Sequence, residues 1–421
     1  MLFKLNILLL NQCFYPDVVS TAQHLTDLAV ELAERGHDVT VIASDRGYDD
    51  PAKRFPRKER WRGVNVIRIS ALSFGKGTRL RRALNFGSFL INCTLRLLWL
   101  PRYDAVVALT SPPLISLLGA LFVKLKGGRF FFWAMDLNPD EAIAAGWLKE
   151  SSLLAKTLEA FLRYSLRHAE KIVVLDRFMK KRILDKGISE QRIVVLPPWP
   201  YTHAIGFDRA GREAFREEHE LAEKFVVMYS GNHSPCHPLE TLLEAARHLS
   251  ARSEIVFCFV GGGSEKKKVQ EFAAHYSLQN VVCLPYQPIA ALSGSLSAAD
   301  LHVVVMGEKF VGIVHPCKVY NVLAVGSPFL YIGPDESHVI DIAGDHENEN
   351  SIFVTRHGDA DTAAKQILKA ASRATNGAAG RAVALPEKFS RDVLLPGMIA
   401  VLETASSSAS VASVAVSSTS A

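Results

Sequence analysis

The sequence predicts an α/β protein with two Rossmann-like, doubly wound domains that face a central cleft. Short apolar runs alternate with amphipathic helical patterns, which is typical of parallel sheets with right-handed crossovers. A stiff stretch, Pro197-Pro198-Trp199-Pro200, separates two such series near the middle of the 421 residues. Since 48% of the residues are apolar, the chain can fill a separate core in each half.

The first half opens with an apolar run at residues 5–10, which we interpret as a buried strand. It is not interpreted as a signal peptide, because no small-residue cleavage site follows it. A helix is expected over residues 20–35, where apolar side chains recur at helical spacing, and Gly36 ends it. Further strands are expected at residues 39–43, 64–69, 105–109, 130–134 and 171–175.

Residues 105–123 carry no charge over nearly the length that spans a membrane. Pro112-Pro113 interrupts this run in the middle, however. Because proline breaks a helix interior, we favour a strand followed by a buried helix at residues 114–124 over a transmembrane span.

The second half repeats the alternation. Strands are expected at residues 225–230, 255–260, 281–284, 301–306, 329–332 and 352–355. Glycines follow the first two of these strands, and open α/β sheets bind ligands at the C-terminal ends of their strands. A last helix is expected over residues 386–403, and the Ser/Ala/Val-rich residues 404–421 are predicted to be disordered.

Residues 311–328 hold the strongest functional signal. Pro316 suits the first turn of a helix, and Gly326 suits its end. The free N–H groups at a helix start attract anions, whereas the helix dipole disfavours a lysine such as Lys318 in that turn. This misfit indicates a phosphate ligand for Lys318. The alternative is an exposed lysine with no ligand.

This stretch is similar to the nucleotide-sugar loop of family 4 glycosyltransferases with the GT-B fold. The branch of colanic-acid and fucosamine transferases carries the pattern P-S-K-x-x-E-Y-L-A-x-G-x-P. Here Cys317 replaces the serine, and Asn321 stands where many relatives have the glutamate that holds the nucleotide ribose. Asparagine can still hydrogen-bond a hydroxyl, but without a charge-assisted bond.

Other segments carry the same resemblance. The segment Asp136-Leu137-Asn138-Pro139-Asp140 resembles D-L-W-P-D/E of this branch, with Met135 where many family members have histidine. Residues 229–233 resemble the first donor-phosphate loop, although the arginine and lysine of many relatives are absent. Residues 14–17 resemble the opening loop of the family.

The resemblance implies a division of labour between the two halves. Residues 1–200 are expected to bind the acceptor and residues 201–385 the donor, with helix 386–403 crossing back to the first half. The catalytic candidates are Asp136 and Lys318. The expected acceptor-binding residues are Tyr15, Pro16, Asp17 and Asp140. The expected donor-binding residues are Gly231, Asn232, His233, Gly261, Gly262, Pro285, Tyr286, His315, Pro316, Cys317 and Asn321.

The resemblance also implies the reaction. A hexosyl group would pass from a nucleoside-diphosphate sugar, the co-substrate, to a lipid-linked precursor of a cell-surface polysaccharide, with retention. Backbone N–H groups near Gly231 and the Lys318 ammonium would stabilise the leaving diphosphate. No DxD-like pair suggests a metal, and no other cofactor is expected. Two alternatives stay open: a sugar-nucleotide epimerase of GT-B architecture, and a catalytically weakened donor-binding partner protein.

Charge and composition suggest where such an enzyme would act. The net charge of +5 is compatible with anionic donors or an anionic membrane and is too small to indicate nucleic acid. A basic stretch at residues 76–82 precedes the apolar run 84–100, which suits an interfacial membrane helix; the alternative is a buried helix with a solvated basic cap. Six scattered cysteines indicate a reducing compartment. We therefore expect a peripheral protein at the cytoplasmic face of the membrane.

Overall fold

The computed structural model describes residues 4–17, 19–48, 50, 52–72, 74, 79–200, 205–344, 351–375 and 385–416. Residues 76–78 of the predicted basic stretch and residues 417–421 of the predicted tail lie outside this set. The chain forms two compact units. Unit 1 comprises Met1–Pro198 with Asp392–Ala421, and unit 2 comprises Trp199–Arg391.

Unit 1 is built on an eight-stranded sheet with the strand order β3-β4-β2-β1-β5-β6-β7-β8. Its neighbouring strands are parallel except for β3, which runs antiparallel to β4. The order reverses between β1 and β5, the kind of point at which open α/β sheets bind ligands. The strands are β1 (Asn6–Leu10), β2 (Asp38–Ser44), β3 (Lys58–Trp61), β4 (Val64–Ile69), β5 (Ala105–Ala108), β6 (Arg129–Trp133), β7 (Lys171–Val174) and β8 (Ile193–Val195).

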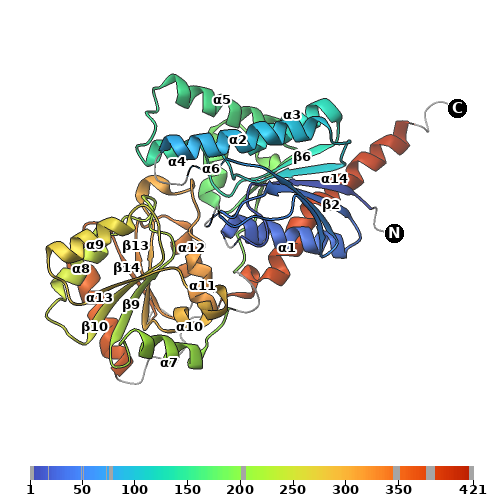
Figure 1. The fold of residues 1–421 in the computed structure, drawn as a ribbon. Coiled ribbons are helices and arrows are strands. Elements are labelled where there is room, and N and C mark those ends of the chain that lie inside the picture. Colours follow the sequence, from blue (N-terminus) through green and yellow to red (C-terminus); the bar gives the residue numbers. More distant parts are fainter. Residues whose placement is uncertain are drawn as a thin grey trace. The chain divides into compact units, whose positions relative to one another are not determined.

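Helices cover both faces of this sheet. Figure 1 shows α2, α3 and α5 grouped on one side of it and α1 on the other. The helices of unit 1 are α1 (Ser20–Glu34), α2 (Arg79–Leu98), α3 (Ile115–Lys126), α4 (Asp140–Ala144), α5 (Leu153–His168) and α6 (Arg177–Asp185), with a 3-10 turn η1 at Glu190–Arg192. The charge-free run 105–123 is therefore a strand, a loop and a helix. In the described part of the chain, we find no helix with the length and apolarity needed to cross a bilayer.

Unit 2 has a six-stranded, fully parallel sheet with the order β11-β10-β9-β12-β13-β14. This is the doubly wound order, with its switch point between β9 and β12. The strands are β9 (Phe225–Ser230), β10 (Ile255–Val260), β11 (Val281–Leu284), β12 (Leu301–Val305), β13 (Phe329–Ile332) and β14 (Ile352–Thr355). The helices are α7 (Arg209–Glu218), α8 (Glu240–His248), α9 (Lys266–His275), α10 (Leu292–Ser297), α11 (Lys318–Ala324), α12 (His338–Gly344) and α13 (Ala360–Thr375), with 3-10 turns η2 (Ile289–Ala291), η3 (Glu308–Phe310) and η4 (Glu387–Phe389).

The alternation of side chains along each strand fills two cores in unit 2. On β9, Val227 and Tyr229 enter the core that α8 and α13 complete. Val226 and Met228 point the other way, into the core that contains Phe215 of α7. Both faces of β9 are thus buried, as expected for a central parallel strand.

The last helix, α14 (Arg391–Val416), differs from its prediction at both ends. It begins at Arg391, because a 3-10 turn follows Pro386 and Ser390 has an extended backbone. It also continues beyond Thr404 to Val416, where disorder was predicted. The helix belongs to unit 1, where the Glu403 carboxylate accepts a hydrogen bond from His37 Nε2 at 3.1 Å.

Candidate functional site

The loops after β9 and β10 are joined by backbone hydrogen bonds. The amide of Gly231 donates to Val260 O at 2.9 Å, and the amide of His233 donates to Gly262 O at 2.7 Å. Gly261 has a φ of 130°, and a Cβ there would lie 2.1 Å from Gly231 O. Only glycine permits this close approach, which holds the two loops against each other at the C-terminal edge of the sheet.

Lys318, the first residue of α11, reaches the first of these loops. Its ammonium donates to the Tyr229 hydroxyl and, at 3.2 Å, to Asn232 O, and it lies 3.9 Å from the centroid of the Tyr229 ring. A Cβ at Gly231 would come within 2.6 Å of Lys318 Cε, so the glycine makes room for the lysine. Burial lowers the pKa of Lys318 well below its usual range. An anion at this position would restore its charge.

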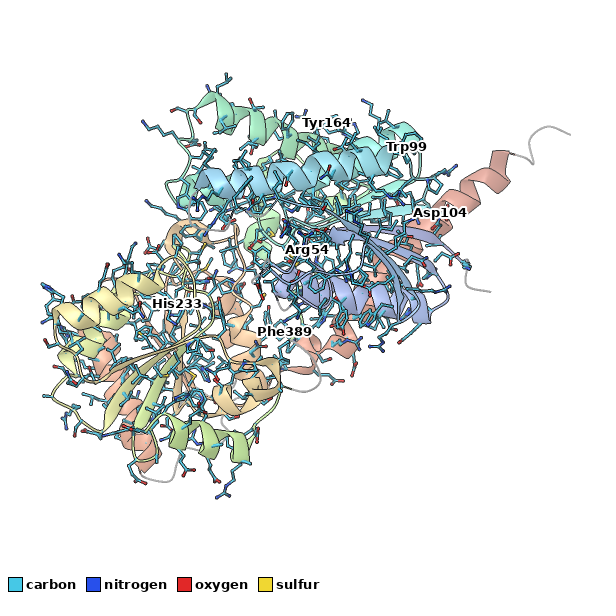
Figure 2. The ribbon with its side chains drawn as sticks, viewed as in Figure 1. Arg54, Trp99, Asp104, Tyr164, His233 and Phe389 are labelled. Carbon is cyan, nitrogen blue, oxygen red and sulfur yellow. The ribbon has the colours of Figure 1, made fainter. Side chains whose placement is uncertain are left out.

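His233 is the most enclosed side chain of the loop (labelled in Figure 2). Its Nδ1 donates to Gly231 O at 3.1 Å and to Gly262 O at 3.3 Å, which fixes the tautomer. Its Nε2 is buried and has no hydrogen-bond partner among the described residues. Burial, and then the charge of Lys318, lower the pKa of His233 to about 4, so the ring is neutral at pH 7.

A second lysine, Lys266, ties β10 to β11. Its ammonium donates to Gly261 O and to Leu284 O, both at 2.6 Å. Pro285 and Tyr286 follow directly, and the Tyr286 hydroxyl donates to Gly262 O at 3.3 Å. Tyr286 is 54% exposed. The sequence gives no signal for Lys266, since its two acceptors are main-chain atoms.

The helix that follows His315 is shorter than the sequence predicts. Helix α11 starts at Lys318 with Cys317 as its N-cap, so Pro316 precedes the helix. Gly326 ends it with a φ of 70°, as the sequence predicts. His315 Nε2 lies 2.8 Å from the Tyr320 hydroxyl, and its ring stacks on His338.

Asn321 lies half-buried on α11. Cys317 Sγ donates to His315 O at 3.4 Å. The structure therefore brings Gly231, Asn232, Gly262 and Lys318 into one cluster. The His315 ring instead stacks on Tyr320 and on His338.

In unit 1, Asp136 follows β6 in the loop that leads to α4. Burial, and then the negative charge of Glu141, raise the pKa of Asp136 to about 8. Burial also raises the pKa of Glu141, while a hydrogen bond from Asn138 Nδ2 to Glu141 Oε2 at 3.2 Å opposes this rise. Glu141 escaped the sequence analysis because an acidic residue in a first helical turn is common.

The other predicted residues of unit 1 are held by protein groups. The Asp140 carboxylate accepts from Lys186 Nζ at 3.0 Å, and Lys186 also pairs with Glu159. The Asp17 carboxylate accepts from the Tyr48 amide at 2.8 Å. Tyr15 stacks on Trp61 at 4.0 Å and stays 41% exposed, and Pro16 is half-buried beside it.

Two family matches cover most of the chain. Residues 21–199 match the Glycosyl transferase 4-like domain, and residues 211–375 match Glycosyl transferases group 1. The chain is a GT-B glycosyltransferase of the family 4 type. In this glycosyltransferase the two matches coincide with the main parts of units 1 and 2.

Named relatives agree with this assignment. The glycosyltransferase is 27% identical over 333 residues to the putative colanic acid biosynthesis glycosyl transferase WcaI of Escherichia coli, which covers 74% of this chain and 79% of the relative. It is 25% identical over 247 residues to the probable glycosyltransferase WbjE of Pseudomonas aeruginosa. This match covers 58% of this chain and 61% of the relative.

Solved structures share the fold. Sucrose-phosphate synthase from Thermosynechococcus elongatus superposes with a TM-score of 0.72 at 15% identity, covering 96% of this chain and 99% of the other. Anabaena HepE in complex with UDP-glucose superposes with a TM-score of 0.69 at 14% identity, and the match covers 95% of this chain and 100% of the other.

Proposed function

We propose that this glycosyltransferase moves a hexosyl group from a nucleoside-diphosphate sugar to a lipid-linked precursor of a cell-surface polysaccharide, with retention and without a metal ion. Lys318 is the observation that carries the proposal. Its ammonium is placed against a glycine-lined loop, and the oxygens to which it donates, Tyr229 Oη and Asn232 O, are neutral. A diphosphate at this loop would supply the missing negative charge and receive stabilisation as it leaves.

The nature of the donor follows from the same cluster. Anabaena HepE binds UDP-glucose in a structure with the same fold, so a nucleoside diphosphate with an attached sugar suits the C-terminal edge of the unit 2 sheet. The exposed ring of Tyr286 offers a stacking surface for a base. The name of the relative WcaI, a putative colanic acid biosynthesis glycosyl transferase, supports a polysaccharide precursor as acceptor.

A membrane-bound acceptor is supported by the surface of α2. One face of α2 is buried through Phe89, Cys93 and Leu97. Large apolar side chains on other positions are exposed, with Ile91 at 63% and Trp99, just after the helix, at 84% (labelled in Figure 2). The exposed set on and beside α2 is Leu80, Leu84, Ile91, Leu95, Leu98 and Trp99.

Neighbouring helices also carry exposed apolar side chains. Helix α3 packs against both α2 and α5, and Figure 1 shows the three helices on one side of unit 1. Leu125 of α3 is 72% exposed, and Leu153 at the start of α5 is 81% exposed. Exposed basic residues accompany them at Arg81, Lys124, Lys126 and Lys156. Exposed apolar side chains accompanied by basic residues suit an anionic lipid surface such as the cytoplasmic leaflet.

The donor assignment is tested by titrating UDP and GDP in excess chelator. Binding should persist, because the diphosphate site needs only protein groups. Loss of binding that magnesium restores would overturn the metal-free proposal. Candidate sugar nucleotides are then offered with a lipid-linked acceptor, and NMR of the product reads the anomeric configuration. Sugar epimerised in the absence of acceptor would instead support the epimerase alternative.

The membrane assignment is tested by vesicle flotation. The protein should bind vesicles with anionic lipid more tightly than neutral ones, and less tightly at high salt. Replacing Ile91, Leu95 and Trp99 together by Gln should weaken binding at least about tenfold, since each buried large apolar side chain contributes roughly 1.5–3 kcal/mol. The control is Ile289→Gln, an exposed apolar residue of unit 2. Equal flotation of the triple variant and the control would reject this surface.

A further inference from the structure

We propose that Lys266 is a positioning residue for the donor diphosphate: together with His233 it turns three peptide units so that their amides, and not their carbonyl oxygens, face the ligand. These peptide units lie in the loops 231–233, after β9, and 261–263, after β10. The inference deepens the proposed function, on which it rests in taking these two loops to bind a diphosphate.

Three carbonyl oxygens of the two loops are engaged by protein donors. Lys266 Nζ donates to Gly261 O at 2.6 Å. His233 serves the other two, since its Nδ1 donates to Gly231 O at 3.1 Å and its main-chain amide donates to Gly262 O at 2.7 Å. A carbonyl oxygen that faced a phosphate would repel it, so these hydrogen bonds remove an obstacle to anion binding.

The amides of the same loops have no such partners. Among the described residues we find no acceptor for the amides of Asn232, Gly262 and Gly263. Asn232 and Gly263 are exposed, and Gly262 is half-buried. The Gly231 amide, in contrast, donates to Val260 O at 2.9 Å and is not available to a ligand. Groups of free main-chain amides form the anion-binding concavities of many phosphate sites.

The engaged carbonyls and the free amides belong to the same three peptide units. Each of these peptides is trans, and in a trans peptide the C=O and N–H bonds point in opposite directions. Because Lys266 holds Gly261 O, the Gly262 amide points away from Lys266. The bond to an ammonium also polarises the peptide, which makes its N–H a stronger donor. His233 orients the amides of the other two units in the same way.

Lys266 also brings a positive charge to these peptide units. Its second acceptor is Leu284 O, at 2.6 Å, so both of its acceptors are neutral, and we find no carboxylate paired with it in the described part of the chain. The next lysine differs, since Lys267 pairs with Glu271 at 2.9 Å. Lys266 is the first residue of α9, where the helix dipole disfavours a cation. A bound diphosphate would offset this unfavourable placement, because it brings negative charge to the same peptide units.

The test measures binding of inorganic pyrophosphate to the full chain by calorimetry, because this probe carries no base and no sugar. Lys266→Met keeps the apolar stem and removes the charge, so the affinity should fall about tenfold or more. The affinity of this variant should also depend less steeply on salt than that of the wild type. Lys267→Met, which removes an adjacent lysine that is 83% exposed, is the matched control and should behave as the wild type in both respects.

Equal pyrophosphate affinities of the two lysine variants would overturn the proposal. A loss in Lys266→Met that keeps the wild-type salt dependence would also overturn it, since Lys266 would then be only a structural link between β10 and β11. If Lys266→Met does not fold, glycine-selective ¹⁵N NMR of the wild type takes its place. Pyrophosphate should then shift the amide resonances of Gly262 and Gly263 and leave that of Gly36 in unit 1 unchanged. Unshifted resonances of the two loop glycines would overturn the proposal equally.

Sugar transfer separates this inference from the proposed function. A pyrophosphate site that depends on Lys266, in a protein that transfers sugar to no acceptor, would support the positioning role and reject the proposed function. Transfer by Lys266→Met with the wild-type kcat/KM for the donor would support the function and overturn the positioning role.

Discussion

The donor loops of unit 2 and the β6–α4 loop of unit 1 bury opposite charges by different means. In unit 2, glycines and backbone hydrogen bonds enclose Lys318. In unit 1, the loop after β6 holds Asp136, and Asn138 of the same loop donates to the Glu141 carboxylate. Burial lowers the pKa of the lysine and raises that of the aspartate. Each region thus favours the neutral form of its central side chain, which is Lys318 in unit 2 and Asp136 in unit 1.

The difference lies in what would restore each charge. Lys318 needs an anion, which a diphosphate supplies on binding. Asp136 instead needs solvation or a loss of negative charge nearby, because burial first and Glu141 second oppose its ionisation. The unit 2 cluster therefore suits ligand binding, and the unit 1 turn suits proton transfer. The predictions below separate these two roles.

The largest effect is expected for Asp136→Asn. The substitution keeps size and hydrogen-bonding reach but removes the proton acceptor, so turnover above pH 8 should fall about 10²–10⁴-fold. Donor affinity should stay unchanged, because the donor cluster belongs to unit 2. Steady-state kinetics and a nucleotide titration measure the two quantities.

Asp140→Asn is the control for this variant, since the Asp140 carboxylate is occupied by Lys186. This variant should lower the melting temperature clearly while leaving turnover close to that of the wild type. Wild-type turnover in Asp136→Asn, with an unchanged thermal melt, would reduce Asp136 to a turn residue.

Lys318→Ala should have the next largest effect. Losing a charge-assisted hydrogen bond costs about 1.5–3 kcal/mol, which corresponds to roughly 10- to 150-fold weaker diphosphate binding. Lys267→Ala removes an exposed lysine of α9 and should leave binding within twofold of the wild type. Cys317→Ser should also be nearly silent, because a serine can make the same bond to His315 O. Equal losses in the two lysine variants would mean that Lys318 contributes only to net charge.

The smallest expected effect is a proton linkage. Since burial lowers the pKa of Lys318 and a bound diphosphate would raise it, binding should take up a proton. Affinity should then fall with rising pH, by at most tenfold per unit, between the free and the bound pKa of this lysine. Calorimetry of UDP binding in buffers of different ionisation enthalpy measures the uptake. An equal uptake in Lys318→Met would assign the proton to another group.

The fold was largely predictable because buried parallel strands are continuous apolar runs. The strands 255–260 and 329–332 were predicted with their observed bounds. Strand β3 was missed, because Lys58–Trp61 pairs along one edge only and carries charged side chains. Strand β8 is three residues long and adjoins the prolines of the linker, which hid its pattern.

The site was predictable only where a local motif marks it. Lys318 and Gly231 stand in recognisable loops, but their contact joins residues far apart in the chain. The hydroxyl of Tyr229 meets Lys318 across 89 positions, and no single-sequence pattern reports such a pair. Glu141 was missed for a different reason. An acidic residue in a first helical turn is common, so nothing in the sequence marks the effect of its charge on the pKa of Asp136.

The placement of α14 has a consequence for biosynthesis. Unit 1 is discontinuous, since all of unit 2 lies in the chain between Pro198 and Asp392. During translation, nearly two hundred residues emerge between the first part of unit 1 and its last helix, so unit 1 cannot complete its fold until they have been synthesised. Meanwhile the surface that later receives Met398, Ile399 and Leu402 stays uncovered. Domains generally fold as units during synthesis, so unit 2 can reach its native state while unit 1 still lacks its final helix. A chain truncated before α14 would thus contain an incomplete unit 1 with exposed apolar surface, to which chaperones bind.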